Sequence, residues 1–186
     1  MDDFSLGNVQ SIGASGKVWM GHGAIDIADL LFDELDKATK SIQISSYSTG
    51  HISNEMTRFF KKLKEKLADP PMKITIILND DGKKSITPFA RKQIAKLQSY
   101  KPEQFFPVYF KSTKIKNTHK ILHAKIIVID ETTALVGSAN ISKGALDSNY
   151  EIMLKIVGDT PKILSKMLTT LSEEIKLGRA WCEDLI

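Results

Sequence analysis

The sequence predicts an α/β fold in which a mixed, mainly buried β-sheet is flanked by helices on both faces. Segments with apolar residues at helical spacing alternate with short apolar runs, and strand-like runs then cluster toward the end of the chain. The length of 186 residues suits one domain. We therefore expect a single domain over residues 1–186, with a core at about 24–178, an acidic N-terminal segment at 1–23 and a C-terminal tail at 179–186.

Four segments predict amphipathic helices, because apolar residues recur in them every three or four positions. Asp69-Pro70-Pro71 is expected to end the second helix, and Pro88 is tolerated in the first turn of the third. The expected helices cover residues 24–40, 53–68, 88–99 and 161–177.

Six shorter segments predict strands. The first has Ile42 and Ile44 on one face, and the second is a β-branched apolar run typical of a buried strand. A polar, basic loop is expected at residues 111–120. The expected strands cover residues 41–47, 73–79, 105–110, 123–130, 134–138 and 151–157.

Charge is distributed unevenly, although the net charge is only +4. Residues 1–36 contain seven acidic residues and one basic residue, whereas residues 82–125 contain eleven basic residues and one acidic residue. A basic segment attracts polyanions, since each phosphate that it neutralises releases counterions. The alternative is that these lysines only solvate the faces of helices.

Other features of the sequence favour a cytoplasmic protein without membrane attachment. The first residues do not resemble a secretory signal, and no apolar run approaches the ~20 residues that a bilayer-spanning helix needs. The single cysteine, Cys182, cannot form an intrachain disulfide. Trp19 and Trp181 are interpreted as surface or interface anchors.

The residues best suited to catalysis lie in and after the strands expected at 123–130 and 134–138. His123 and Lys125 are two residues apart, so on a strand they would share a face, and the same holds for Ser138 and Asn140. Asp130 has the opposite parity and is expected to be structural.

A turn of small residues, beginning at Gly137, would present backbone N–H groups to an anion. Together these positions supply an imidazole, an ammonium, an amide and a hydroxyl group, a set suited to a phosphoryl group.

The pattern His123-x-Lys125-x4-Asp130, then Gly137-Ser138-x-Asn140 and Glu151, resembles the signature of the phospholipase D superfamily. The resemblance covers about residues 24–178 and is greatest to the short branch of single-motif endonucleases. It implies a phospholipase D-like fold and a metal-independent phosphodiesterase. Because active sites of this family contain two copies of the motif and this chain has one, the resemblance also implies a symmetric homodimer with a shared pocket.

Carried over by position, the resemblance assigns a role to each signature residue. His123 of one subunit would attack phosphorus and form a phosphohistidine, while His123 of the partner subunit would protonate the leaving oxygen and then activate water. Lys125 and Asn140 would hold the non-bridging oxygens, with support from Ser138. Glu151 would accept a hydrogen bond from the imidazole, either of its own subunit or of the partner subunit, and fix its tautomer.

Several neighbouring residues are candidates for substrate contact. Tyr47, Ser48 and His51 follow the first strand and would line the mouth of the pocket, with loop packing as the alternative. Four residues of the basic loop would place positive potential beside His123: Lys114, Lys116, His119 and Lys120.

No metal or other cofactor is expected. His119 and His123 have a spacing that binds zinc from a helix, but no glutamate lies between them and the adjacent lysines would repel a cation.

The basic segment favours nucleic acid as the substrate, with DNA before RNA. The alternatives are a phospholipid phosphodiesterase or phosphatidyltransferase, and a non-catalytic nucleic-acid-binding subunit of a larger defence or restriction complex. A role in DNA restriction or defence would need a specificity or helicase partner protein, since we find no separate DNA-recognition domain.

Overall fold

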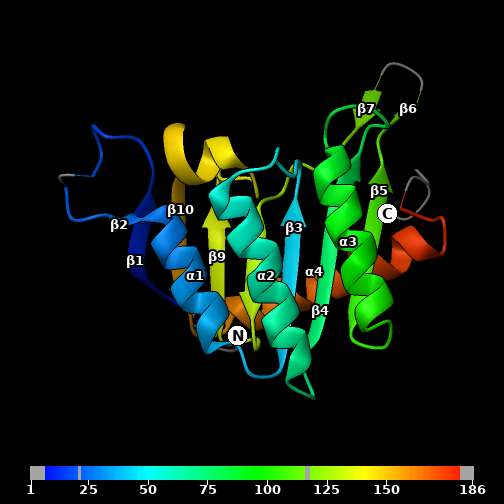
Figure 1. Ribbon diagram of the computed structural model, residues 1–186, viewed down its shortest axis with the longest axis horizontal. Helices are drawn as coiled ribbons and strands as arrows, with labels where there is room; N and C mark the ends of the chain where they lie inside the picture. Colours follow the sequence, from blue (N-terminus) through cyan, green and yellow to red (C-terminus); the bar gives the residue numbers. More distant parts are fainter. Residues whose placement is uncertain (1–6, 21, 116–117, 181–186) are drawn as a thin grey trace, which may run out of the picture.

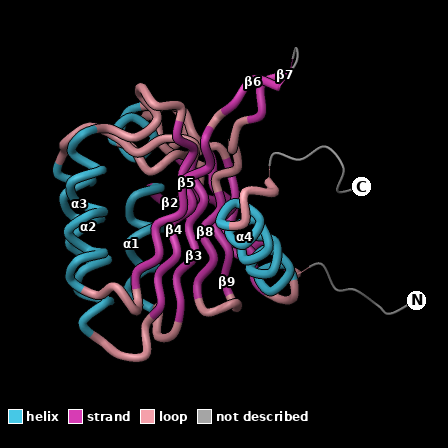
Figure 2. Tube along the Cα trace, turned by 90° about the vertical axis from the view of Figure 1, so that its right-hand side faces the viewer, coloured by secondary structure: helices cyan, strands magenta, loops and turns pink. Residues whose placement is uncertain are grey.

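The computed structural model describes residues 7–20, 22–115 and 118–180, and they form three layers: helices, a sheet and a helix (Figures 1 and 2). This confirms the predicted α/β class. The central sheet has eight strands in the order β2-β1-β10-β9-β8-β3-β4-β5. Its strands are β1 (Asn8–Ala14), β2 (Ile25–Asp26), β3 (Ser41–Ser46), β4 (Lys73–Asp80), β5 (Phe105–Lys111), β8 (Ile126–Ile129), β9 (Thr133–Gly137) and β10 (Ile152–Val157).

Three helices cover one face of the sheet and a fourth covers the other (Figure 2). On the first face lie α1 (Ile27–Lys37), α2 (Asn54–Ala68) and α3 (Pro88–Tyr100), and on the second lies α4 (Thr160–Lys176). A short helical turn, η1 (Gly144–Ser148), precedes β10. Within the described residues, no helix combines the length and apolar character needed to cross a bilayer.

The strand directions bring the ends of several strands together at one edge of the fold. β4 and β5 continue parallel to β3, whereas β8 runs antiparallel to it. β9 is antiparallel to β8, and β10 to β9, so β9 runs in the same direction as β3. Consequently β3, β4 and β9 end where β8 and β10 begin, and we call this the polar end of the sheet.

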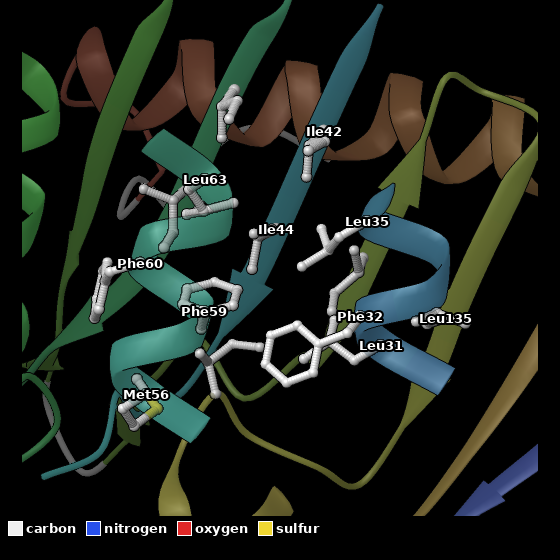
Figure 3. Packing of buried hydrophobic residues seen from close by; sticks show 14 of the residues in the cluster. Leu31, Phe32, Leu35, Ile42, Ile44, Met56, Phe59, Phe60, Leu63 and Leu135 are labelled. Atoms are coloured by element: carbon white, nitrogen blue, oxygen red, sulfur yellow. The ribbon is translucent and has the colours of Figure 1, made fainter. Parts of the chain in front are cut away.

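Two hydrophobic clusters hold the layers together. In the larger, Phe32 on α1 and Phe59 on α2 pack over Ile42 and Ile44 of β3 (Figure 3). In the smaller, Leu168 and Ile175 of α4 pack with residues of the opposite face of the sheet, including Ile77 and Val128. Burial of these side chains contributes roughly 1.5–3 kcal/mol for each large one, which makes the sheet a rigid base for the residues at its ends.

The first helix begins later than its periodicity predicts. Asp26 caps α1 by accepting hydrogen bonds from the backbone N–H groups of Ala28 and Asp29, at 2.9 and 3.3 Å. Ile25 and Asp26 instead pair with β1 as the short strand β2. The prediction of a helix over 24–40 was therefore too long at both ends, since α1 stops at Lys37.

The basic loop expected at 111–120 is instead a hairpin. Its strands, β6 (Thr113–Ile115) and β7 (Thr118–Lys120), pair antiparallel and project beyond the sheet (Figure 1). A polar sequence with few β-branched apolar residues gives little sign of such a hairpin.

Asp130 closes the turn between β8 and β9. Asp130 and Glu131 both have positive φ, 52° and 57°, and Thr132 N–H donates to the carbonyl of Ile129, which together make a type I′ turn. The Asp130 carboxylate accepts four hydrogen bonds of 2.7–2.8 Å from the first residue of β3 and the two residues before it: from the backbone of Thr39, Lys40 and Ser41 and from the Thr39 hydroxyl. It thereby fixes the end of the sheet opposite to the polar end.

We predict that Asp130→Asn lowers the free energy of unfolding by about 1–2 kcal/mol at pH 7, because one acceptor oxygen is replaced by a donor. Burial alone would raise the pKa of Asp130, but the hydrogen bonds from Ser41, Thr39 and Lys40 lower it below its usual value. A carboxyl whose pKa is lower in the folded state stabilises the fold above its unfolded pKa, and this contribution is lost as the pH falls through the folded pKa.

Urea unfolding from pH 7 to pH 2 should therefore show the difference between the wild type and Asp130→Asn shrinking below about pH 4. The exposed Asp33→Asn on α1 serves as the matched control. A difference that stays constant down to pH 2 would contradict the assignment.

Candidate active site at the polar end of the sheet

The signature residues meet at the polar end of the sheet although they are distant in sequence. His123 and Lys125 immediately precede β8, Ser138 and Asn140 follow β9, and Glu151 immediately precedes β10. Tyr47 and Ser48 reach the same place from the end of β3, and Asn79 from the end of β4.

His123 lies on an exposed segment that side chains from two strands hold in place. Asn79 accepts a hydrogen bond from Leu122 N–H at 3.0 Å, and the Ser45 hydroxyl donates to the Ala124 carbonyl at 3.1 Å. The imidazole ring is 5.1 Å from the ring of Tyr47, at an interplanar angle of 58°. The ring is thus exposed at one side and supported at the other.

The strand expected at 123–130 begins only at Ile126. The pairing of β3 with β8 ends at Ser45 and Ile126, so His123 and Lys125 precede the strand. The prediction that both side chains share a strand face therefore does not apply. Lys125 is 7% exposed whereas His123 is exposed.

The Lys125 ammonium lies partly buried among groups that stabilise its charge. It donates to the His123 carbonyl at 2.6 Å and lies 5.6 Å from the centre of the Tyr47 ring, within range of a cation–π interaction. Burial lowers the pKa of Lys125, and the negative charge of Glu151 partly offsets this effect. With one donor used by His123, two N–H groups of the ammonium are left to hold an anion.

Asn140 is oriented by the end of β3. Its Oδ1 atom accepts hydrogen bonds from Ser48 N–H at 3.1 Å and from the Ser46 hydroxyl at 3.3 Å. Ser46 also accepts from Ile141 N–H at 3.2 Å, which ties the segment after β9 to β3. Because Oδ1 is used in this way, the amino group is the part of the Asn140 amide that can donate to a ligand.

Glu151 bonds to Ser138 rather than to the imidazole. The Ser138 hydroxyl donates to Glu151 Oε2, and the side chain of Asn149 donates to Oε1 at 3.2 Å. Among the described residues, no hydrogen bond joins Glu151 to His123. The expected tautomer-fixing contact is therefore absent within one chain, and Glu151 acts here on the charge of Lys125 and on the orientation of Ser138.

The turn beginning at Gly137 does not offer the expected row of free N–H groups. The N–H of Gly137 donates to the Lys125 carbonyl at 3.3 Å, and that of Ser138 to the Ile152 carbonyl at 2.9 Å. Glycine is required because a Cβ atom at position 137 would lie 1.9 Å from the Ile152 carbonyl oxygen. Gly137 thus permits close packing against β10, and the first two N–H groups of the turn are used by Lys125 and Ile152.

Three of the remaining predicted contact residues, Lys114, His119 and Lys120, lie on the projecting hairpin. Lys120 and the exposed His119 are on β7, and the backbone of Lys114 pairs with that of His119. Lys116 lies outside the described residues, as do Trp181 and Cys182. In the described part of the chain, no three His, Cys, Asp or Glu side chains are placed to hold a metal ion together.

Sequence reasoning missed the residues that position the site. Ser45, Ser46 and Asn79 are all buried at the ends of strands, and each bonds to a segment at least 33 residues away. Polar side chains within otherwise apolar strands were the available signal, since a buried polar group needs a partner.

The chain is similar to known proteins over most of its length. A family model described as "Cardiolipin synthase, PLD-like domain" matches residues 31–175. NucT from Helicobacter pylori is 23% identical, with a TM-score of 0.64 over 89% of this chain and 95% of NucT. Nuc from Salmonella typhimurium, described as a phospholipase D family member, is 20% identical, with a TM-score of 0.59 over 89% of this chain and 92% of Nuc. At these identities the likeness of the structures shows the fold. A comparison with curated protein sequences finds no match.

The electrostatic link between Glu151 and Lys125 can be tested directly. We predict that Glu151→Gln lowers the pKa of Lys125 further, because it removes the charge that opposes the effect of burial. Titration of the Lys125 side chain by NMR should show the decrease, and Glu173→Gln, an exposed carboxylate on α4, should leave the Lys125 pKa where it is in the wild type. An unchanged or higher Lys125 pKa in Glu151→Gln would contradict the link.

Proposed function

Because the chain belongs to the phospholipase D-like domain family, as its signature predicted, we propose that it is a metal-independent phosphodiesterase that cleaves nucleic acid, with DNA as the first candidate. The observation that carries this proposal is the meeting of His123, Lys125 and Asn140 at the polar end of the sheet. An exposed imidazole beside a partly buried ammonium and an oriented amide combines a nucleophile with donors for the oxygens of a phosphate.

The chemistry follows in two steps. An imidazole nitrogen of His123 attacks phosphorus, the bond from phosphorus to the leaving oxygen breaks, and that oxygen takes a proton from His123 of the partner subunit. In the second step, the partner's His123 takes a proton from water, the water oxygen attacks phosphorus, and the phosphorus–nitrogen bond breaks. Lys125 and Asn140 donate to the non-bridging oxygens as negative charge develops on them.

A homodimer is part of this proposal, because each chain supplies one copy of the signature. An exposed apolar surface beside the site supports it. We call it the β1–β10 surface, and it consists of the exposed Ile12, Ile25, Tyr150 and Ile152 together with the half-buried Trp19, whose ring contacts that of Tyr150.

The β1–β10 surface adjoins the signature residues and is large enough to receive side chains of a second copy. Ile152 follows Glu151 directly, and its N–H donates to the Ser138 hydroxyl at 3.2 Å. Four members of the surface line a hollow of about 570 Å³, in which Ile12 is 47% exposed. Burial of this surface against a second copy would bring two sets of signature residues close together.

Charge favours nucleic acid over lipid as the substrate. The basic hairpin and the lysines of residues 82–125 lie on the chain next to His123, where positive potential would attract a polyanion. The family model carries the name of cardiolipin synthase, so phosphatidyl transfer is the second candidate. In a restriction or defence role, the same hydrolysis of phosphodiester bonds would act on DNA, and a partner protein would supply the sequence specificity.

The first test is activity without metal ions. In excess EDTA, the purified protein should hydrolyse single-stranded DNA, duplex DNA or RNA faster than phosphatidylcholine vesicles, and His123→Ala should reduce the rate at least 10³-fold, an order of magnitude typical of the loss of a nucleophile. His119→Ala, on the hairpin that would attract the substrate, is the matched histidine comparison, and it should affect KM and not abolish turnover. Activity that survives in His123→Ala would show that another group is the nucleophile, and hydrolysis of vesicles alone would favour the lipid candidate.

The second test is the oligomeric state. We predict that sedimentation velocity shows a dimer for the wild type and a monomer for Ile12→Asp, because burial of an unpaired carboxylate opposes association by several kcal/mol. Phosphodiesterase activity should fall together with dimerisation. Met167→Asp, an exposed apolar position on α4, is the matched control. An active monomer would contradict the shared pocket, and a dimer unaffected by Ile12→Asp would contradict the β1–β10 surface as the interface.

A further inference from the structure

A second pocket lies beside the site, and the proposed reaction assigns it no role. It has a volume of about 340 Å³ and lies between three loops, around residues 48–51, 84–87 and 142–144. We propose that this pocket binds a neighbouring phosphodiester of the same polynucleotide strand whose scissile phosphate lies at His123. The inference rests on the proposed function and makes it more specific, because it requires a substrate with a further phosphate beyond the one that reacts.

The pocket continues directly from the site along one short segment. The Tyr47 ring contacts His123, Ser48 N–H donates to Asn140, and the next three residues line the pocket. Four residues of extended chain, from Tyr47 to His51, span at most about 14 Å. At a rise of about 3.4 Å per nucleotide of a strand, this distance corresponds to a few nucleotides at most.

The groups in the pocket suit a phosphate. Lys84 and Lys143 supply two exposed ammonium groups, and His51 supplies a ring N–H donor. Thr49 is only 1% exposed, and its hydroxyl has no hydrogen-bond partner among the described residues. Since buried hydroxyls are normally bonded, the wall of the pocket contains a polar group that the described chain leaves unsatisfied.

Two carboxylates near these lysines direct their hydrogen bonds mainly to backbone N–H groups and serine hydroxyls. Asp81 accepts hydrogen bonds from the N–H groups of Lys83, Lys84 and Ser85 and from the Ser85 hydroxyl, at 2.8–3.0 Å. Its negative charge therefore holds the backbone of the loop. Glu55 is bonded mainly to its own N–H and to Ser53, and Lys143 makes only the smallest of the contributions that lower its pKa.

The three loops are fixed to one another, so the pocket is largely formed before a ligand arrives. Thr49 N–H donates to the Ser85 carbonyl at 2.8 Å, and Gly50 N–H donates to the Ile141 carbonyl at 2.9 Å. The Thr87 hydroxyl donates to the Gly50 carbonyl at 2.7 Å. Gly50 is needed for this approach, since a Cβ atom there would lie 2.7 Å from Ser142 Cα. A preformed site loses little conformational entropy on binding.

The experiment measures binding separately from catalysis. In a His123→Ala background, fluorescence anisotropy of a labelled single-stranded 20-mer is compared for the parent, Lys84→Ala/Lys143→Ala and the control Lys73→Ala/Lys166→Ala. The control removes the same charge, at the other end of β4 and on α4. Circular dichroism establishes that all three proteins are folded.

We expect the Lys84→Ala/Lys143→Ala variant to bind the 20-mer about tenfold more weakly than the control. The plot of the logarithm of the association constant against the logarithm of the salt concentration should also have a slope shallower by about 0.7 than that of the control. This is the value for the loss of one phosphate contact to a single strand. In the background with His123 intact, the ratio of kcat/KM for the 20-mer to kcat/KM for bis(4-nitrophenyl) phosphate, which has one phosphate, should fall about tenfold.

The possible failures are distinguishable. Equal affinity of the Lys84→Ala/Lys143→Ala variant and the control would overturn the second phosphate site and leave the proposed phosphodiesterase intact. An equal loss of kcat/KM on both substrates would also overturn it, because the lysines would then act at the reaction centre. If the wild type hydrolyses neither substrate, the proposed function fails, while the anisotropy comparison still decides whether the pocket binds a strand.

Discussion

The site depends on the direction of β8 relative to β3. Because β8 is antiparallel to β3, its first residue lies beside the end of β3, and the segment with His123 and Lys125 enters the sheet there. β9 returns in the direction of β3 and delivers Asn140 to the same place. With a parallel β8, the imidazole and the ammonium would lie at the end of the sheet that Asp130 closes. Strand order thus determines which chemical groups can meet, and side-chain hydrogen bonds then set their orientation.

Because those hydrogen bonds join residues distant in sequence, they also limited how much of the structure could be predicted from the sequence. Apolar periodicity located α2, α3 and α4 to within a residue or so, because each buries one continuous face. The beginning of β8 was wrong by three residues, since the apolar run does not reveal that pairing with β3 ends at Ser45. The segment around His123 is held instead by Asn79 and Ser45, which are 43 and 79 positions away from their partners. A single sequence does not reveal such pairs.

The chemical groups of the site were predictable because they follow a spaced signature, whereas their surroundings were not. Nothing in the sequence around Lys125 indicates that its ammonium is partly buried beside Tyr47 and the charge of Glu151. Burial of an ammonium is costly unless the charge is compensated, and here a carbonyl, an aromatic ring and a carboxylate compensate it. The same carboxylate also bonds to Ser138 and Asn149, so in the described part of one chain its hydrogen bonds go to these two side chains and not to the imidazole.

The pairing of β1 with β10 has a consequence for biosynthesis. Residues 8–14 are made well before their long partner strand at 152–157, and Ser15 bonds to the backbone of Asn149 and Glu151. A chain emerging from the ribosome therefore cannot complete this half of the sheet until residues 152–157 have been translated. Ser138, Asn140 and Glu151 are made only shortly before that strand, so a nascent polypeptide would acquire its full set of reactive groups at about the time when β1 can pair.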